Sequence, residues 1–169
     1  MEINNRCIKY RLPNGHTVDI LPHVIETMSS FKQTLSNLPE SCGYIFGYKD
    51  KNTKNITLSD ITKPQKNDYR MRFYCSLKDV NHKVILKLQA TNKNYYMGVW
   101  HTHPQATPVP SITDWDDWNK TLLEDNTGSE YVFFIIVGTI NTRIWVGSFI
   151  DNSITEIYEC ESTNGVYIV

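Results

Sequence analysis

The stretch that decides the fold of this chain reads Tyr95-Tyr-Met-Gly-Val-Trp-His-Thr-His103 and is followed by Pro104. Its aromatic and β-branched residues are typical of a strand, and the proline predicts that the strand ends in a loop. Because side chains alternate between the two faces of a strand, His101 and His103 project to one side and Thr102 to the other. Two imidazoles on the same side of a strand end are what one metal ion requires of its ligands.

The residues after this strand supply further polar groups. Seven residues separate His103 from Ser111, and three of them are prolines, so this segment is expected to be a stiff loop. A helix is expected from residue 111 to about residue 123, with Asp114 in its first turn. Two histidines and one acid can hold zinc and leave its fourth position for water. Ser111 and Asp114 also match a helix capping box, which needs no metal, so both interpretations stand.

Two separate segments resemble a known family. The string from His101 to Asp114 is similar to the H-x-H-x(7)-S-x(2)-D signature of the JAMM metallopeptidases, also called the JAB or MPN-plus family. That family also carries an upstream glutamate in a pattern resembling E-x-x-G-x-[LI]-x-G, and Glu40-Ser-Cys-Gly43-Tyr-Ile45-Phe-Gly47 fits it at every position. The resemblance implies an α/β fold of the JAB/MPN type, which is cytidine-deaminase-like. In that α-β-α sandwich a mixed sheet is flanked by helices, here as a single domain over residues 1–169.

The resemblance also assigns a role to each site residue. It implies that one Zn2+ with a bound catalytic water is held by His101, His103 and Asp114. Glu40 would be the general base, and Ser111 would donate a hydrogen bond to the oxyanion. Zinc lowers the pKa of its water to about 7, so a nearby carboxylate suffices to move the proton. A glutamate is more commonly just exposed, but the apolar run after Glu40 is typical of a buried strand.

The family's substrates suggest a reaction for this chain. JAMM enzymes cleave the amide bond after the C-terminal glycine of ubiquitin or ubiquitin-like proteins. The string Gly98-Val-Trp-His-Thr-His-Pro104, with the short proline-rich loop, looks most like the stand-alone bacterial branch. Members of that branch are found in anti-phage operons beside ubiquitin-activating-like and ubiquitin-conjugating-like enzymes. There the peptidase removes a nucleotidyltransferase from its conjugation target. We therefore expect an isopeptidase that acts on a ubiquitin-like modifier or a conjugated protein, with these operon proteins as partners.

Two other functions stay open on the sequence. One is a different zinc amidohydrolase, for example an enzyme that trims a sulfur-carrier precursor. The other is a non-catalytic scaffold, the role of family relatives that have lost ligands, although every ligand position is filled here. Only residues 124–130 separate the Asp114 helix from the next strand, which favours a minimal core enzyme over a polyubiquitin-chain specialist.

Composition narrows the remaining classes. A chain of 169 residues with 40% hydrophobic content is expected to form one compact domain. A net charge of −1 gives no overall attraction for phosphate backbones, so nucleic acid is not an expected partner. No apolar run is long enough for a membrane span, and the first residues lack a signal-peptide core, so a cytoplasmic protein without a membrane partner is expected. The four cysteines have no C-x-x-C spacing and are expected to be free thiols.

Local patterns predict the other elements. A hairpin is expected around Pro13-Asn14-Gly15, from strands at residues 7–12 and 16–20, covering one edge of the sheet. A helix from Pro22 is expected to bury one stripe, made of Val24, Met28, Phe31, Leu35 and Leu38. Further strands are expected at residues 42–48, 55–61, 131–137, 143–150 and 154–159.

The middle of the chain is expected to hold a loop and a second helix. Residues 62–73 have no clear period and are the segment most typical of a functional loop. After them, Ser76 and Asp79 are expected to cap a helix whose inward-facing residues are Leu77, Val80, Val84 and Leu88.

Overall fold

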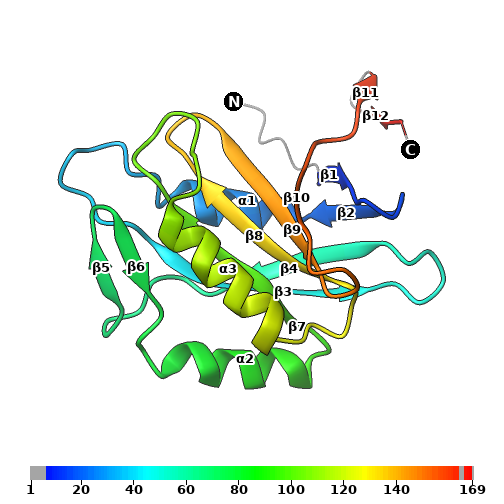
Figure 1. Cartoon of the computed structure of the whole chain (residues 1–169), viewed down its shortest axis with the longest axis horizontal. Helices are drawn as coiled ribbons and strands as arrows, with labels where there is room; N and C mark the ends of the chain where they lie inside the picture. The colour runs from blue at the N-terminus through cyan, green and yellow to red at the C-terminus, as the bar shows by residue number, and fades with distance from the viewer. Residues whose placement is uncertain (1–6, 164–165, 169) are drawn as a thin grey trace.

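The computed structural model describes residues 7–163 and 166–168. At its centre is an eight-stranded mixed sheet with the order β1-β2-β4-β3-β7-β8-β9-β10 (Figure 1). Its strands are β1 (Ile8–Arg11), β2 (Thr17–Ile20), β3 (Cys42–Lys49), β4 (Ile56–Ile61), β7 (Tyr95–Thr102), β8 (Tyr131–Val137), β9 (Thr142–Ser148) and β10 (Ile154–Ile157). The pairs β2/β4 and β7/β8 are parallel and the others are antiparallel, so the predicted α/β class and mixed sheet are confirmed.

Three helices and two short ladders complete the described chain. The helices are α1 (Pro22–Ser29), α2 (Asn81–Thr91) and α3 (Ile112–Glu124). One ladder pairs β5 (Tyr69–Met71) with β6 (Tyr74–Ser76), and the other pairs β11 (Ser162–Thr163) with β12 (Val166–Tyr167).

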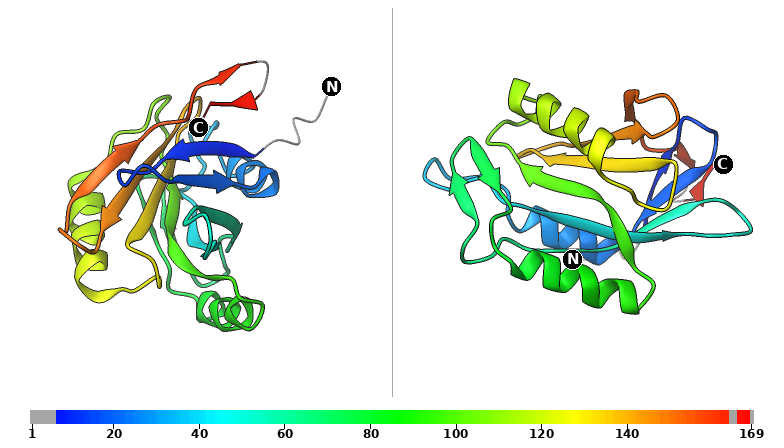
Figure 2. Two further views of the ribbon diagram at one scale, coloured as in Figure 1. Left: turned by 90° about the vertical axis from the view of Figure 1, so that its right-hand side faces the viewer. Right: turned by 60° about the horizontal axis from the view of Figure 1, so that its bottom comes forward.

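The strand β8 explains how the layers form. All seven of its side chains are buried, as its unbroken apolar sequence predicts. Its odd-numbered residues belong to the core cluster that contains Val24 and Met28 of α1, and its even-numbered residues pack with Trp118 and Leu122 of α3. The helices α1 and α3 therefore lie on opposite faces of the sheet, as the left view of Figure 2 shows. Burying one such large side chain contributes about 1.5–3 kcal/mol, so both helices are firmly held.

The chain after β10 returns to the opposite edge of the sheet. Glu159 forms a bridge with Tyr10 of β1, and the backbone N–H of Cys160 donates to the carbonyl of Lys9 over 2.8 Å. The predicted hairpin of β1 and β2 is present at this edge. An unpaired edge strand is a template for aggregation, and this contact covers part of the outer side of β1.

The first helix is shorter than predicted. It ends at Ser29, and Leu35, expected in its buried stripe, is 62% exposed. The polar residue Gln33 is buried instead, and its side-chain amide donates to the carbonyls of Leu38 and Arg72. Apolar spacing predicted more helix because it carries no information about these contacts, which draw the backbone out of the helical path.

The inward face predicted for the second helix is wrong. Val80, Val84 and Leu88 are all exposed, Val80 to 72%, and the helix begins at Asn81 without a side-chain cap. The buried face carries His82, whose Nε2 lies 2.7 Å from the Asp68 carboxylate and whose Nδ1 lies 2.8 Å from the Thr62 hydroxyl. This buried polar pair sets the rotation of the helix, because leaving it unpaired would cost more than exposing aliphatic side chains.

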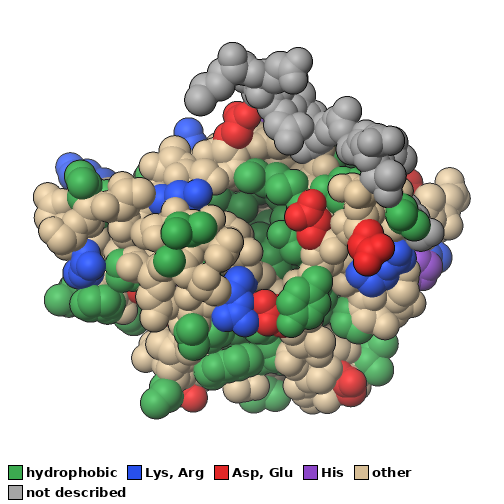
Figure 3. Space-filling view, turned by 90° about the horizontal axis from the view of Figure 1, so that it is seen from above, with side chains coloured by type: hydrophobic (Ala, Val, Ile, Leu, Met, Phe, Trp, Pro, Cys, Tyr) green, Lys and Arg blue, Asp and Glu red, His purple; other side chains and the backbone are tan. Residues whose placement is uncertain are grey.

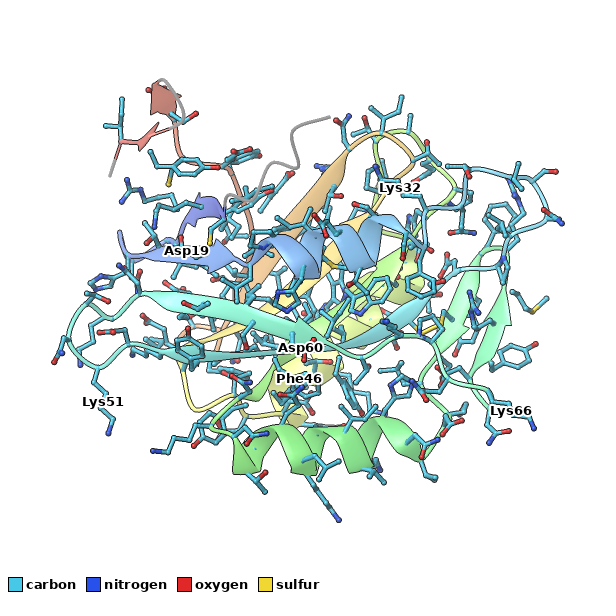
Figure 4. All side chains as sticks on the ribbon, turned by 180° about the vertical axis from the view of Figure 1, so that it is seen from behind. Asp19, Lys32, Phe46, Lys51, Asp60 and Lys66 are labelled. Carbon is cyan, nitrogen blue, oxygen red and sulfur yellow. A yellow bond between two sulfur atoms is a disulfide. The ribbon has the colours of Figure 1, made fainter. Side chains whose placement is uncertain are left out.

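The inner side of α2 packs against β3 and β7. Asp60 of β4 accepts a hydrogen bond of 2.7 Å from the Gln89 side chain of this helix. Asp60 is also the register partner of the buried Phe46, and Figure 4 shows both residues beside α2. The helix is thus fastened by polar contacts at both Gln89 and His82.

Two of the four cysteines are not free thiols. Cys42 of β3 and Cys75 of β6 form a disulfide, whereas Cys7 and Cys160 are free, as predicted. The partners are 33 residues apart, and only the folding back of the β5–β6 hairpin brings them together. The predicted loop over residues 62–73 is therefore only partly a loop, since its last part contains β5.

Charged side chains of both signs are mixed on the face seen from above. Figure 3 shows acidic, basic and hydrophobic side chains interspersed on that face. Among the described residues, no helix combines the length and the apolar character that crossing a membrane requires.

Candidate metal centre

The end of β7 is the base of the candidate site. In the sheet, Cys42 of β3 lies opposite His101 of β7, which brings Glu40, two residues before β3, close to the histidines. His103 follows the strand, and its backbone N–H donates to the carbonyl of Val137 over 3.0 Å. The strand pairing thus places the upstream glutamate beside the two histidines.

The proline-rich loop returns the chain over the strand end. The backbone N–H of Thr139 donates to the carbonyl of Gln105, and that of Asn141 donates to the carbonyl of Ala106. The loop is therefore fixed to the turn between β8 and β9. The loop leads to Ser111, the N-cap of α3, and the side chain of Asp114 in the first turn of that helix lies beside both histidines.

Three nitrogen and oxygen donors converge at this point. The two histidine Nε2 atoms are 3.0 Å apart, and the Asp114 carboxylate oxygens lie 3.1 Å from His101 Nε2 and 3.2 Å from His103 Nε2. Ligand atoms around a tetrahedral Zn2+ with bonds of about 2.0–2.1 Å lie about 3.3 Å from one another. The donor types and their separations therefore fit zinc.

Glu40 lies just outside this triangle of donors. Its carboxylate is 3.8 Å from His103 Nε2. Even so, one ligand atom from each of Glu40, His101 and His103 lies within 4.8 Å of the other two. Both Glu40 and Asp114 are thus near enough to be considered as the third donor. Asp114 is the better candidate because it is closer to both histidines.

The environment of Glu40 suits a group that carries a proton. The residue is only 5% exposed. Burial raises the pKa of Glu40 to about 8; the charge of His103 lowers this pKa and the charge of Asp114 raises it. A carboxyl group with a raised pKa can hold and release a proton near neutral pH.

Hydrogen bonds orient the donors. Burial raises the pKa of Asp114, but the hydrogen bonds from His101 and His103 outweigh it and hold that pKa far below its usual range. For His103, burial lowers the pKa, and the hydrogen bond and charge of Asp114 raise it above its ordinary value. The Nδ1 of His103 lies 3.3 Å from the Gln105 side-chain oxygen, so a proton on Nδ1 leaves Nε2 free for an ion.

Ser111 and Asp114 form the predicted capping box. The Ser111 hydroxyl oxygen accepts from the Asp114 backbone N–H over 3.1 Å, and the Ser111 backbone N–H donates to the Asp114 carboxylate over 2.7 Å. This does not exclude a second role, because capping uses a lone pair of the hydroxyl and leaves its hydrogen available. The structure thus brings all five predicted site residues to one place.

A cavity of about 440 Å³ opens beside these residues. Its wall includes Glu40, His101 and Asp114, together with Phe73, Tyr74 and Cys75 of the hairpin. The same face of α3 continues the wall with Asp117, Lys120, Thr121 and Glu124. The sequence did not identify these lining residues individually; only the irregular pattern of residues 62–73 pointed to the hairpin.

Fold and site together define a class of protein: an α/β domain whose mixed sheet carries a histidine and carboxylate donor set at the end of a central strand, open to a cavity. A sequence model described as prokaryotic homologs of the JAB domain matches residues 27–147. This match covers more than half of the chain. The chain belongs to this family.

Individual relatives agree with the family assignment. A protein of Vibrio cholerae named CD-NTase/cGAS isopeptidase is 29% identical over 148 residues, covering 86% of this chain and 90% of that protein. A protein of the same name from Escherichia coli is 30% identical over 147 residues, covering 85% and 88%. The resemblance drawn from the motifs, to the stand-alone bacterial JAB peptidases, is confirmed.

A solved structure shares the fold. The solution structure of a protein from Desulfitobacterium hafniense matches with a TM-score of 0.56 and 18% sequence identity, covering 81% of this chain and 87% of that one. At this identity the likeness concerns the fold alone.

Proposed function

We propose that this protein is a zinc-dependent isopeptidase that cleaves the amide bond after the C-terminus of a ubiquitin-like modifier or conjugated protein. The observation that carries the proposal is the convergence of His101, His103 and Asp114 beside a buried Glu40 at the wall of a cavity. Membership of the JAB family and the isopeptidase names of two relatives support it.

The three converging donors would hold the metal. His101, His103 and Asp114 would hold one Zn2+, since their mutual separations of 3.0–3.2 Å match a tetrahedral site. A bound Zn2+ supplies a water whose pKa is lowered to about 7 and polarises a carbonyl oxygen. Gln105 holds His103 in the tautomer that leaves Nε2 toward the ion.

The other two residues move a proton and stabilise charge. Glu40 accepts a proton from the attacking water and delivers it to the leaving amine. Burial raises the pKa of Glu40, the charge of His103 lowers it and the charge of Asp114 raises it, which together give a pKa of about 8. A carboxyl group with such a pKa can both accept and release a proton near neutral pH. Ser111 donates its hydroxyl hydrogen to the oxyanion that forms at the carbonyl, an interaction worth roughly 3–4 kcal/mol in similar sites.

The names of the relatives support a substrate and a setting for the reaction. Their name, CD-NTase/cGAS isopeptidase, supports a nucleotidyltransferase as the conjugated protein and a role in bacterial anti-phage defence. The corresponding partners are ubiquitin-activating-like and ubiquitin-conjugating-like enzymes of the same operon. We further propose that one domain spanning residues 1–169 carries out the reaction in the cytoplasm.

The test is cleavage of a conjugate by the purified protein. The zinc-loaded enzyme is incubated with a C-terminally extended modifier or with the nucleotidyltransferase conjugate. We expect cleavage that a chelator abolishes and zinc restores. Glu40→Gln should abolish cleavage while about one zinc per chain is retained, and Glu26→Gln, at an exposed position of α1, should leave it unchanged. Cleavage by metal-free protein would refute the proposal.

The same assay distinguishes the other functions. Activity on a short Gly-Gly-amide, with none on a folded modifier, would favour a different zinc amidohydrolase such as a sulfur-carrier processing enzyme. Zinc-loaded protein that cleaves neither substrate would favour a non-catalytic scaffold.

A further inference from the structure

The residue between the two histidines, Thr102, is part of a buried hydrogen-bond network. Its side chain is fully buried and lies on the side of β7 opposite the histidines. Its hydroxyl accepts from the Ser41 backbone N–H over 2.9 Å and donates to the Gln33 side-chain oxygen over 2.9 Å. The Thr102 backbone N–H also donates to the carbonyl of Ser41 over 2.9 Å. Thr102 therefore binds Ser41, the neighbour of Glu40, through both its backbone and its side chain.

A second set of contacts holds Glu40 from the hairpin. Arg70 of β5 donates from Nε to the carbonyl of Glu40 and from Nη2 to the Ser41 hydroxyl, each over 2.7 Å. The backbone N–H of Glu40 donates to the carbonyl of Met71 over 2.8 Å. Both backbone polar groups of Glu40 are thus occupied by the hairpin, and its side chain is directed by a backbone held on two sides.

Gln33 joins the two sets of contacts. Its side chain accepts from the Thr102 hydroxyl and donates to the carbonyls of Leu38 and Arg72 over 3.1 and 2.9 Å. The side chains of both Gln33 and Thr102 are buried. The network therefore connects the histidine strand, the segment that precedes Glu40, and the hairpin.

We propose that Thr102 is a positioning residue whose hydroxyl, together with Gln33 and Arg70, sets the separation between Glu40 and the histidine pair. This proposal rests on the isopeptidase function proposed above. The hydroxyl faces away from the histidines, so it acts only through Ser41 and Gln33. Without it, the buried Ser41 N–H loses its acceptor, and the backbone beside Glu40 shifts to find another. Misplacing a catalytic group by about 1 Å can reduce a rate on the order of 100-fold.

A purely structural role for the hydroxyl makes a different prediction. In that case its loss lowers the stability of the fold but leaves the turnover of the folded, zinc-loaded enzyme unchanged. Thr17 provides a matched control, because its hydroxyl is also buried but has no hydrogen-bond partner within the described part of the chain.

The test compares Thr102→Val, Thr102→Ser and Thr17→Val, each loaded with zinc. For Thr102→Val we expect kcat to fall about 10- to 100-fold, with KM and zinc content within about twofold of wild type. Thr102→Ser should recover most of the loss, and Thr17→Val should keep wild-type kcat. Unchanged kcat in Thr102→Val, or an equal loss in Thr17→Val, would overturn the proposal.

Two readouts do not depend on activity. In a crystal structure of Thr102→Val, the distance between the Glu40 carboxylate and His103 Nε2 should exceed the native 3.8 Å, and the Ser41 amide should exchange hydrogen faster. If the wild-type protein cleaves no conjugate, the proposed isopeptidase function is refuted. The two readouts still test whether the Thr102 hydroxyl positions Glu40, and an unchanged distance would refute that proposal. Should Thr102→Val not fold, Arg70→Lys, which loses the paired contacts to Glu40 and Ser41, replaces it with the same expected loss of kcat.

Discussion

The disulfide between Cys42 and Cys75 should account for a large share of the stability of the oxidised protein. It closes a loop whose ends are 33 residues apart. In the chain-entropy description, closing a loop of this length removes unfolded-state entropy equivalent to about 4 kcal/mol at 25 °C. For a domain of this size, such a change lowers the midpoint of thermal unfolding by roughly 8–16 °C.

The perturbation is Cys75→Ser, or reduction of the wild type with a dithiol. Urea unfolding of oxidised protein, reduced protein and Cys75→Ser gives the free energy of unfolding in each case, and the two treatments should agree within about 1 kcal/mol. Cys7→Ser is the matched control, since Cys7 is a free and only partly buried thiol. It should change the free energy of unfolding by less than about 0.5 kcal/mol.

Thiol titration of the denatured chain checks the premise. Oxidised protein should expose two reactive thiols, Cys7 and Cys160, and reduced protein should expose all four. Four thiols in protein purified without a reductant, or a loss of less than about 1 kcal/mol on reduction, would contradict the reasoning. The first result would mean that the pair stays reduced, and the second that the hairpin is already held by its hydrogen bonds to Glu40 and Ser41, just before β3.

Three further predictions concern stability. Trp118→Ala should lower the free energy of unfolding by about 3–5 kcal/mol in urea titrations, because the indole fills the core between α3 and the sheet. Leu88→Ala should change the free energy of unfolding by less than about 0.5 kcal/mol, since Leu88 is exposed. A loss of about 2 kcal/mol or more would instead indicate that Leu88 is buried. Burial raises the pKa of Asp68, but the Gln65 N–H and His82 outweigh it and keep that pKa below its ordinary value. The stabilisation from Asp68 is therefore complete above about pH 4 and is lost as the pH falls through the lower pKa of the folded protein. The stability cost of Asp68→Asn should then be smaller at pH 3 than at pH 7, and an equal cost at both would contradict this.

Elements with strong local signals could be predicted from the sequence. The strand β8 is an unbroken apolar run between turn residues, and α3 begins at a capping box after a proline-rich loop. Both were placed within a few residues of their actual bounds, because short-range patterns dictate them. The convergence of His101 and His103 followed from strand alternation alone.

Elements whose fate depends on distant residues could not be predicted. The spacing of apolar residues predicted that α1 continues beyond Ser29 and that Val84 and Leu88 are buried, and both predictions were wrong. In both cases a buried polar residue decided the outcome: Gln33 after α1 and His82 in α2. A polar side chain is normally expected at the surface, so the sequence gives no signal that its hydrogen-bond partners lie buried elsewhere.

The sequence by itself determined which residues come together at the end of β7. Alternation along the strand puts the two histidines on one side. A short, proline-rich loop and the capping box of α3 then place Asp114 near them, all within fourteen residues of chain. Only the tertiary structure decided how Glu40 is held, which cysteines pair and which face of α2 is buried. Gln33 and Thr102 are 69 residues apart and Cys42 and Cys75 are 33 apart, so their contacts exist only once the sheet and the hairpin have formed.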